Sequence, residues 1–386
     1  MVFFAPFGVE EWMDEWQPRC EWDLAETCCS SLTVQEVLDF AGKDLSELPK
    51  KRLVYGDIPG SVALRTHIAS LYDAAAGIGA DNVLVTQGAI GANFLVLLSL
   101  VGAGTPVVVA HPTYQQLYDA PKAFGGKVTL WKQTSDQDWR HEVDKLVPLL
   151  TRETALVVIN NPKNPTGTHM SKAELEGVVK AVKEHASPEC IILSDEVYSP
   201  LFHSLGPGQE APPSMLQVAA ELGYKNVIAT GSLSKAYALA GLRVGWIASP
   251  RTDLLKLFSD TRNYNVISVS GLDDYIASIA LEPQTRKKIM QRNIELATGN
   301  RTRLESFLKE TGLRWIPTTS GTTAFIELPT GTNDVDFCRR LAKQEKVLLC
   351  PGSYFDYPGW VRLGYVNSAD EIEGGLKRLK SFLSSL

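Results

Sequence analysis

The sequence predicts an α/β protein in which a largely parallel central sheet carries helices on both faces and is joined to a smaller α+β domain. Short apolar, β-branched runs alternate with helix-like stretches from Tyr55 to about Pro250. These runs are continuous rather than alternating in polarity, as is usual for strands covered on both faces. After Gly271 the chain turns to charged, helix-rich segments. Its 386 residues, 44% of them hydrophobic, suffice for two domains.

The larger domain is predicted over residues 46–275. Its apolar runs predict buried strands at residues 83–85, 107–109, 156–159, 191–193, 227–229 and 244–247. Ser171 and Glu174 form a capping-box pattern, which predicts an amphipathic helix over residues 171–185. Strands separated by helices are typical of a parallel sheet.

The smaller domain is predicted from residues 1–45 and 276–386. Residues 273–309 are rich in helix-forming and charged side chains, and residues 323–328 and 361–365 predict strands. The first 45 or so residues do not follow the strand–helix alternation, so we assign them to this domain.

Composition and charge exclude several classes of protein. The formal net charge is -6 without any block of Lys or Arg, so no nucleic-acid partner is expected. No apolar run approaches the ~18 residues of a membrane span, and the apolar start at residues 1–7 lacks the basic residues of a secretory signal. The six cysteines form no C-x-x-C pair and the histidines no metal-binding spacing, which predicts free thiols, no metal and a reducing, cytoplasmic location. Residues 384–386 read Ser-Ser-Leu, without the central Lys of a peroxisomal S-K-L address.

Polar segments follow four of the predicted strands, and ligands of open α/β sheets bind at the carboxyl ends of strands. Residues 86–91 form a small-residue turn before a helix, which could bind an anion. Residues 160–167 contain two Asn-Pro steps. They predict either an ordinary turn or a rigid loop that aims the Asn164 amide at a ligand, with a cis bond before Pro165.

The other two strand ends carry charged residues. Asp195 follows a buried strand, where an unpaired carboxylate would be costly, so it needs a partner. Lys235 follows Ser232 and Ser234 in a Ser/Gly loop, and Arg243 comes shortly after. A single lysine in such a loop is usually an ordinary surface residue, and Ser234 could serve only to support the loop.

Taken in this order, the four strand ends resemble the signature of the class I/II aminotransferases, pyridoxal-5′-phosphate (PLP) enzymes of fold type I, over nearly the whole chain. The N-P-x-N-P-T-G pattern is residues 161–167, D-x-x-Y is Asp195 with Tyr198, and S-x-S-K…R runs from Ser232 to Arg243. Three further segments resemble family motifs: Y-x4-G-x3-L-R from Tyr55 to Arg65, P-x-aromatic from Pro112 to Tyr114, and the late carboxylate-binding arginine at Arg362.

The resemblance implies three catalytic residues: Lys235, Asp195 and Tyr198. Lys235 would hold PLP as an internal aldimine and then shuttle the substrate Cα proton. Asp195 would pair with the ring nitrogen and favour its protonation by roughly 1–3 pKa units. Tyr198 and Asn164 would hydrogen-bond the ring's phenolate oxygen. Tyr114 would stack on the ring, unless it is a core residue.

The resemblance also implies how the phosphate, the substrate and a second subunit are bound. The phosphate ligands would be Ser232, Arg243 and the backbone amides of Gly88, Ala89 and Ile90. Arg362, with Asn164, would hold the substrate α-carboxylate as a bidentate fork, unless Arg362 belongs to a surface ion pair. Tyr55 would reach the phosphate of a neighbouring subunit, which predicts a homodimer with shared active sites.

Two features leave the type of reaction open. Residues 23–30 place Thr27, Cys28 and Cys29 where many relatives have a glycine over the substrate. Residues 10–13 and 262–264 resemble capreomycidine synthase, a PLP enzyme of the same fold that cyclises an arginine derivative. We therefore expect an aminotransferase for an α-amino acid, with a PLP lyase or cyclase as the alternative.

Two other classes of protein fit the sequence less well. A non-catalytic PLP-binding module, such as the effector domain of a transcription regulator, is disfavoured because Lys235 and Asp195 are both present. Family-like sequence also begins by about residue 20, which leaves no room for a DNA-binding domain. A nicotinamide dehydrogenase is disfavoured because no G-x-G-x-x-G pattern occurs. The sequence does not determine the substrate side chain, since the aromatic candidates Trp12, Trp16, Tyr264 and Tyr354 could equally be packing residues.

Overall fold

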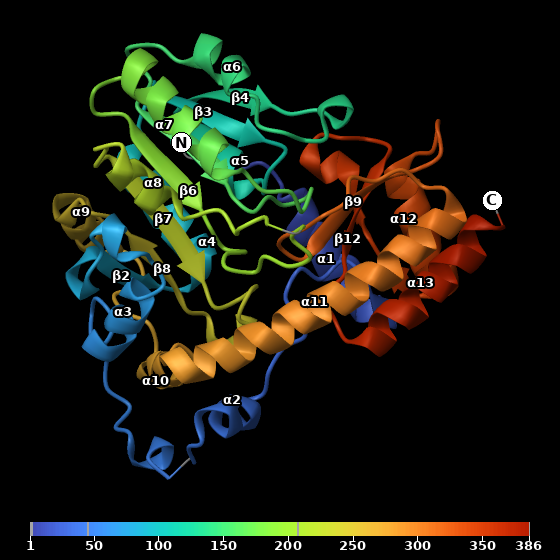
Figure 1. The fold of residues 1–386 in the computed structure, drawn as a ribbon, viewed down its shortest axis with the longest axis horizontal. Coiled ribbons are helices and arrows are strands. Elements are labelled where there is room, and N and C mark those ends of the chain that lie inside the picture. Colours follow the sequence, from blue (N-terminus) through green and yellow to red (C-terminus); the bar gives the residue numbers. More distant parts are fainter. Residues whose placement is uncertain (1–2, 45, 207, 386) are drawn as a thin grey trace.

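The computed structural model describes residues 3–44, 46–206 and 208–385 and contains a seven-stranded sheet (Figure 1). The order of its strands is β2-β8-β7-β6-β5-β3-β4, with β8 antiparallel to both neighbours and the other pairs parallel. The strands are β2 Val83–Thr86, β3 Pro106–His111, β4 Lys127–Lys132, β5 Leu156–Asn160, β6 Ile191–Asp195, β7 Val227–Ser232 and β8 Gly245–Ala248. The predicted largely parallel sheet is thus confirmed, and β4 is a strand that the sequence analysis missed.

Helices cover both faces of this sheet, as predicted. One face buries Leu84, Val109 and Leu193 against α4 Gly88–Leu100, α5 Gln116–Ala123 and α9 Thr252–Arg262. The other face buries Val108 and Ile192 with α3 Val62–Ala69, α6 Val143–Leu146, α7 Lys172–His185 and α8 Met215–Glu221. Helix α7 begins with the predicted capping box, in which Ser171 and Glu174 bond each other's backbone amides.

The remaining strands form two small sheets. An antiparallel sheet has the order β11-β12-β9, from β9 Thr323–Glu327, β11 Cys350–Pro351 and β12 Trp360–Gly364. The short strand β1 Trp22–Asp23 pairs in parallel with β10 Val347–Leu348, so an early segment lies beside a late one. The boundaries proposed at residues 45/46 and 275/276 stay a prediction.

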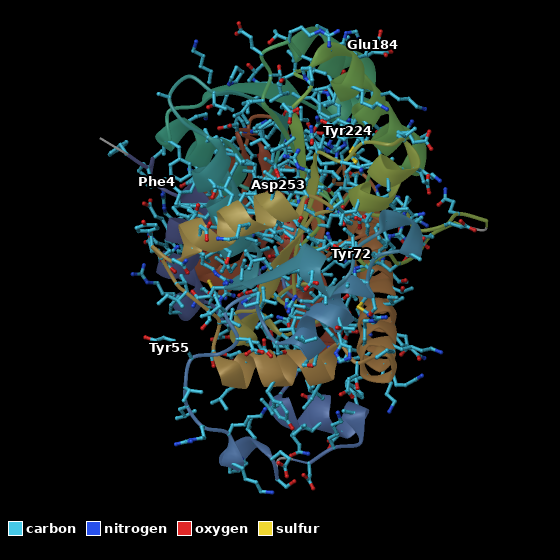
Figure 2. All side chains as sticks on the ribbon, turned by 90° about the vertical axis from the view of Figure 1, so that its left-hand side faces the viewer. Phe4, Tyr55, Tyr72, Glu184, Tyr224 and Asp253 are labelled. Atoms are coloured by element: carbon cyan, nitrogen blue, oxygen red, sulfur yellow. The ribbon has the colours of Figure 1, made fainter. Side chains whose placement is uncertain are left out.

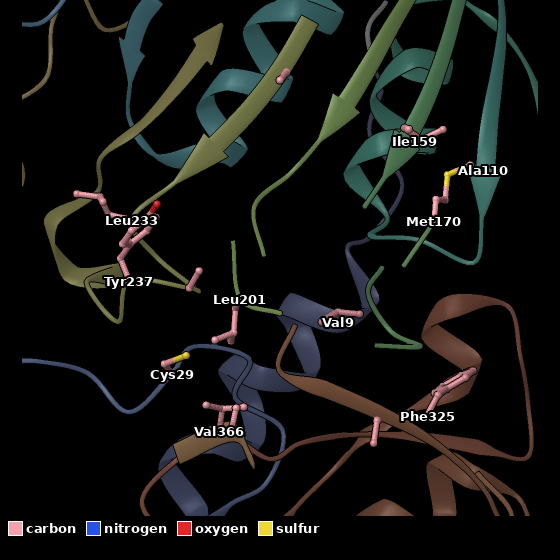
Figure 3. Close-up of a cluster of buried hydrophobic side chains, with 14 of the residues drawn as sticks. Val9, Cys29, Ala110, Ile159, Met170, Leu201, Leu233, Tyr237, Phe325 and Val366 are labelled. Carbon is pink, nitrogen blue, oxygen red and sulfur yellow. The ribbon is translucent and has the colours of Figure 1, made fainter. Parts of the chain in front are cut away.

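Six helices accompany these strands or lead to them. The 29-residue helix α11 runs from α10, which packs against α2 and α3, to α13 (Figure 1). A buried cluster that includes Leu233, Phe325 and Val366 continues between the seven-stranded sheet and the smaller sheet (Figure 3). The helices are α1 Gly8–Trp16, α2 Val34–Ala41, α10 Gly271–Ala280, α11 Pro283–Thr311, α12 Asp334–Glu345 and α13 Ala369–Leu383.

Two expectations about targeting fall partly beyond the described ranges, since residues 1–2 and 386 lie outside them. Across those ranges, no helix is both long enough and apolar enough to span a bilayer. All six cysteines are free thiols, and five of them are buried.

Candidate active site

The strand register brings the carboxyl ends of three parallel strands together. Asn160 at the end of β5 lies opposite Asp195 on β6, and Asp195 lies opposite Thr230 on β7. A cavity of about 310 Å³ opens at this edge, with α1, residues 25–27 and β12 forming the other walls. Every predicted site residue except Gly88 and Tyr55 lines it: Ala89, Ile90, Tyr114, Asn164, Asp195, Tyr198, Ser232, Lys235, Arg243 and Arg362.

Lys235 follows β7 and directs its amine at the segment that the sequence analysis singled out as unusual. Its Nζ donates to Thr27 Oγ1 at 2.7 Å and to Cys28 Sγ at 3.3 Å. It lies 3.6 Å from Glu26 Oε1. The carbonyl of Lys235 accepts a hydrogen bond from the Cys29 amide, so the two segments are also joined through their backbones.

The negative charge beside the Lys235 amine comes from the Glu26 carboxylate and not from the Cys28 thiol. Burial raises the pKa of the Cys28 thiol to about 11, so this thiol is protonated at neutral pH. Burial disfavours ionisation of Glu26 as well, but Lys235 and hydrogen bonds from Cys28 and Thr27 outweigh it and lower the pKa to about 2. Burial likewise disfavours the charged form of Lys235, yet the neighbouring negative charge holds its pKa above the ordinary value.

Asp195 is a buried carboxylate that hydrogen bonds hold in place. Asn93 Nδ2 on α4 donates to Asp195 Oδ2 at 3.0 Å, and the Val197 amide donates to Oδ1 at 3.1 Å. Burial raises the pKa of Asp195 to about 6. No residue of the described ranges forms an ion pair with it, so this side chain suits a cationic ligand group.

Asn164 and Arg362 form the opposite wall of the cavity. Arg362 on β12 donates through Nη1 to Asn164 Oδ1 at 3.2 Å and through Nη2 to the Ala25 carbonyl at 3.0 Å. The backbone amide of Asn164 donates to Asn160 Oδ1 at 2.8 Å. Arg362 is 3% exposed, and its Nε has no partner among the described residues. The surface ion pair considered for Arg362 is therefore wrong. The predicted cis bond before Pro165 is confirmed.

Tyr114 and Tyr198 also face the cavity. Tyr198 is buried, and burial raises its pKa. Tyr114 is half-buried, and its hydroxyl donates to Glu10 Oε1 on α1 at 2.6 Å. Tyr114 is therefore a wall residue rather than a core residue.

The end of the cavity near β7 and β8 is suited to an anion. The N-terminus of α4 presents the amides of Ala89 and Ile90 there. A Cβ atom added to Gly88 would lie 3.0 Å from Arg243 Nη2, so the backbone and the guanidinium approach closely. Ser232 Oγ contacts Ser234 Oγ at 2.8 Å and donates to the Val244 carbonyl at 3.1 Å, so it also holds the loop together.

Gly88 lies directly before the lining residues Ala89 and Ile90, whereas Tyr55 is a predicted site residue that the fold places away from this cavity. It is 80% exposed and lies outside the cavity lining. Figure 2 shows its side chain pointing away from the body of the chain. This placement leaves its predicted role toward a second subunit untested.

Several residues of the site were missed by the sequence analysis. Asn93 is a buried polar residue in a mostly apolar helix, and this contrast was the signal that could have identified it. Asn160, the last residue of β5, was noted only as part of a loop. Glu10 and Asp14 line the cavity from α1; Glu10 was noted only within the segment that resembles capreomycidine synthase, and no motif marks Asp14.

The residues present fit PLP. The phosphate would be held by Arg243 and the N-terminus of α4, where Gly88 leaves room that a side chain would fill. The buried Asp195 carboxylate would take the protonated ring nitrogen as its missing cation. Lys235 supplies the amine. Among the described residues, no group of His, Cys, Asp and Glu is arranged to hold a metal ion.

Comparisons with known proteins agree with this geometry. Residues 24–379 match the family "Aminotransferase class I and II". The chain is 28% identical to an aspartate aminotransferase of Thermotoga maritima over 88% of this chain and 85% of that protein. It is 29% identical to capreomycidine synthase of Streptomyces vinaceus over 98% and 93% of the two chains. A solved PLP-dependent aminotransferase from Streptococcus suis superposes with a TM-score of 0.91 at 35% identity, covering 99% of this chain and 98% of that one. The chain therefore belongs to the class I and II aminotransferase family, and its cofactor is pyridoxal 5′-phosphate.

Proposed function

We propose that the protein transfers the α-amino group of an amino acid to an oxo acid, with Lys235 as the acid–base residue. One observation carries this proposal: the amine of Lys235 shares a single cavity with the buried Asp195 carboxylate and the buried Arg362 guanidinium. When bound, PLP supplies an electron sink that stabilises negative charge at the substrate Cα.

The chain's own residues would orient both bound molecules. Arg243 and the α4 amides would hold the phosphate, and Asp195 would keep the ring nitrogen protonated. Arg362 would hold the substrate α-carboxylate, because a planar guanidinium with an unpartnered, buried Nε can form two parallel bonds with it. The Asn164 side chain already contacts Arg362 and would fix the plane of that guanidinium.

Lys235 would remove and return the proton of the substrate Cα. It is the only lysine that lines the cavity among the described residues, and removal of the Cα proton needs a base within hydrogen-bond reach. Thr27 Oγ1 and Cys28 Sγ, both in contact with Nζ, would hold the amine over the substrate.

A cyclase or lyase is the second candidate, and two observations favour it. The match to capreomycidine synthase covers nearly the whole of both chains. Thr27 and Cys28, which depart from the common family pattern, contact the amine of Lys235 directly. Contacts at this atom could change where a proton is returned, and so change the product.

A half-reaction distinguishes the two candidates. The holoenzyme would be mixed with single amino acids in the absence of any oxo acid, and the products quantified by mass spectrometry. An aminotransferase releases one equivalent of oxo acid per site and then stops until an oxo acid is added. Continued turnover without an acceptor, yielding a cyclised or eliminated product, would replace the aminotransferase with the second candidate.

We also propose that the protein is a homodimer with shared active sites. Leu53, Val54 and Tyr55 are 83%, 71% and 80% exposed on one segment, an unusual concentration of apolar side chains for a free surface. An apolar cavity of about 710 Å³, which includes Ile90 and Arg243 in its lining, opens beside the active site. A second copy of the chain would cover these surfaces and bring Tyr55 of the partner subunit to the phosphate site.

A further inference from the structure

We propose that the substrate is an α-amino acid with a cationic side chain, a guanidinium or an ammonium group, and that Glu10, Asp14 and Glu26 bind this cation. The inference rests on the proposed function, because it assumes that Arg362 holds the α-carboxylate. It adds the chemical class of the side chain, which membership of the class I and II aminotransferase family does not determine.

Helix α1 presents one acidic face to the cavity. Glu10, Met13 and Asp14 line it at the three- and four-residue spacing of one helix face, and Gln17 lines it just beyond the end of the helix. The opposite face buries Trp12 and Trp16, and the Trp12 indole donates to the Leu349 carbonyl at 2.9 Å. This packing fixes the rotation of α1, so Glu10 and Asp14 belong to the cavity wall.

Glu26 extends the acidic wall toward Lys235. Its Oε1 accepts hydrogen bonds from the amides of Thr27 at 2.6 Å and Cys28 at 2.7 Å. Lys235, whose Nζ lies 3.6 Å from Oε1, and the hydrogen bonds from Cys28 and Thr27 lower the pKa of Glu26, so this carboxylate is ionised at neutral pH and can accept a further donor.

The charges of the cavity are otherwise assigned. Three cationic side chains line it, and each already has a proposed role. Lys235 transfers the Cα proton, Arg243 binds the phosphate, and Arg362 binds the α-carboxylate. Neither Glu10 nor Asp14 forms an ion pair with any residue of the described ranges, although Glu10 accepts the Tyr114 hydroxyl.

A second observation points to the ligand itself. Arg362 is buried, lines the same cavity and keeps an unpartnered Nε, so a carboxylate is expected at that wall. A substrate anchored there presents its side chain to a space bounded by three carboxylates. An acidic side chain would be repelled, whereas a cation would form charge-assisted hydrogen bonds.

The test compares ligands that differ in charge but little in shape. Binding of L-arginine, L-ornithine, L-citrulline, L-norleucine and L-glutamate to the holoenzyme would be measured by calorimetry and by the change in cofactor absorbance. We expect L-arginine or L-ornithine to bind at least about tenfold more tightly than L-citrulline, as charged hydrogen bonds usually provide. Asp14→Asn and Glu26→Gln should each reduce this ratio by about threefold or more.

Glu11→Gln is the matched control, because Glu11 is an exposed acid of α1, as Glu10 and Asp14 are, but does not line the cavity. It should leave the ratio unchanged. Tighter binding of L-citrulline, L-norleucine or L-glutamate would overturn the proposal of a cationic substrate side chain, and so would an unchanged ratio in both cavity variants. Either result would leave the proposed function in place. Absence of binding by every amino acid would overturn the proposed function, and this inference with it.

Discussion

At the scale of a single residue, Asp195 shows how a carboxylate that is costly to bury can be suited to bind a cationic ligand group. Its carboxylate is buried, and its pKa is raised to about 6 because burial disfavours the charge. The hydrogen bonds from Asn93 and Val197 hold it in place without supplying a positive charge. A carboxylate kept in this condition is ready for a cationic ligand group, which a protonated ring nitrogen provides.

Replacement of Asp195 by Asn should leave the fold intact and remove most activity. The side chain keeps its size, but the counter-charge is lost, and the protonated fraction of the ring should fall by about ten- to a thousandfold. The measurement is kcat with a saturating amino acid, together with PLP binding. An Asp195→Asn variant that binds PLP and turns over at the wild-type rate would show that Asp195 has another role.

Glu196, which follows Asp195 in the chain, should make the stability of the fold depend on pH. Burial raises the pKa of Glu196 from 4.5 to about 7. Between these pH values the folded protein holds a proton that the unfolded chain has lost, so the free energy of unfolding falls as the pH rises, by up to about 3 kcal/mol. Glu196→Gln should remove this contribution. Urea unfolding at pH 4.5 and 7.5 measures it, and parallel pH profiles for the two proteins would contradict the assignment.

At the scale of elements, the site depends on a close contact between β8 and the N-terminus of α4. A Cβ atom added to Gly245 would lie 2.3 Å from the Gly88 carbonyl carbon and 2.6 Å from the Ala89 nitrogen. No side chain fits there unless the start of α4 moves. The same helix start is the proposed phosphate site, so packing and cofactor binding share one contact.

Gly245→Ala should therefore weaken both stability and PLP binding. Overpacking of this kind costs about 1–3 kcal/mol, and a displaced α4 would hold the phosphate less well. Gly102→Ala is the matched control, because an added Cβ would meet no atom within 4 Å. Thermal unfolding and equilibrium PLP binding would be measured for both variants. Equal effects, or none from Gly245→Ala, would show that this contact is unimportant.

Sequence patterns predicted elements well where burial is complete and less well elsewhere. The strands β2, β3, β5, β6, β7 and β8 are buried on both faces and appear as continuous apolar runs. The edge strand β4 mixes exposed lysines with apolar residues, so its run was not recognised. The acidic face of α1 could not be predicted, because the contacts that orient it, such as Trp12 with Leu349, join residues far apart in the chain.

At the scale of the whole molecule, one chain accounts for most but not all of the proposed site. The motif residues from Ala89 to Arg362 meet in one cavity because parallel strands place their carboxyl ends at one edge. Tyr55 is the exception, exposed on a segment rich in apolar side chains. The proposed second subunit would account for both features, and no contact within one chain tests it.

Mixing two inactive variants tests the dimer. Tyr55→Ala and Lys235→Ala would each lose activity, because one lacks a phosphate contact and the other lacks the amine. In a hybrid dimer with shared sites, one of the two sites has both residues intact, so about a quarter of the wild-type activity should return after subunit exchange. No recovery in a mixture that ultracentrifugation shows to contain dimers would argue against sharing.

The most direct test of the central claim is to find which lysine binds the cofactor. The holoenzyme would be reduced with borohydride, digested, and the pyridoxyl-labelled peptide identified by mass spectrometry. Lys163 provides the internal comparison, because it is also buried and burial lowers its pKa to about 7, which makes its amine reactive. The account predicts a label on Lys235 and none on Lys163. A label on Lys163, or on any lysine other than Lys235, would contradict it.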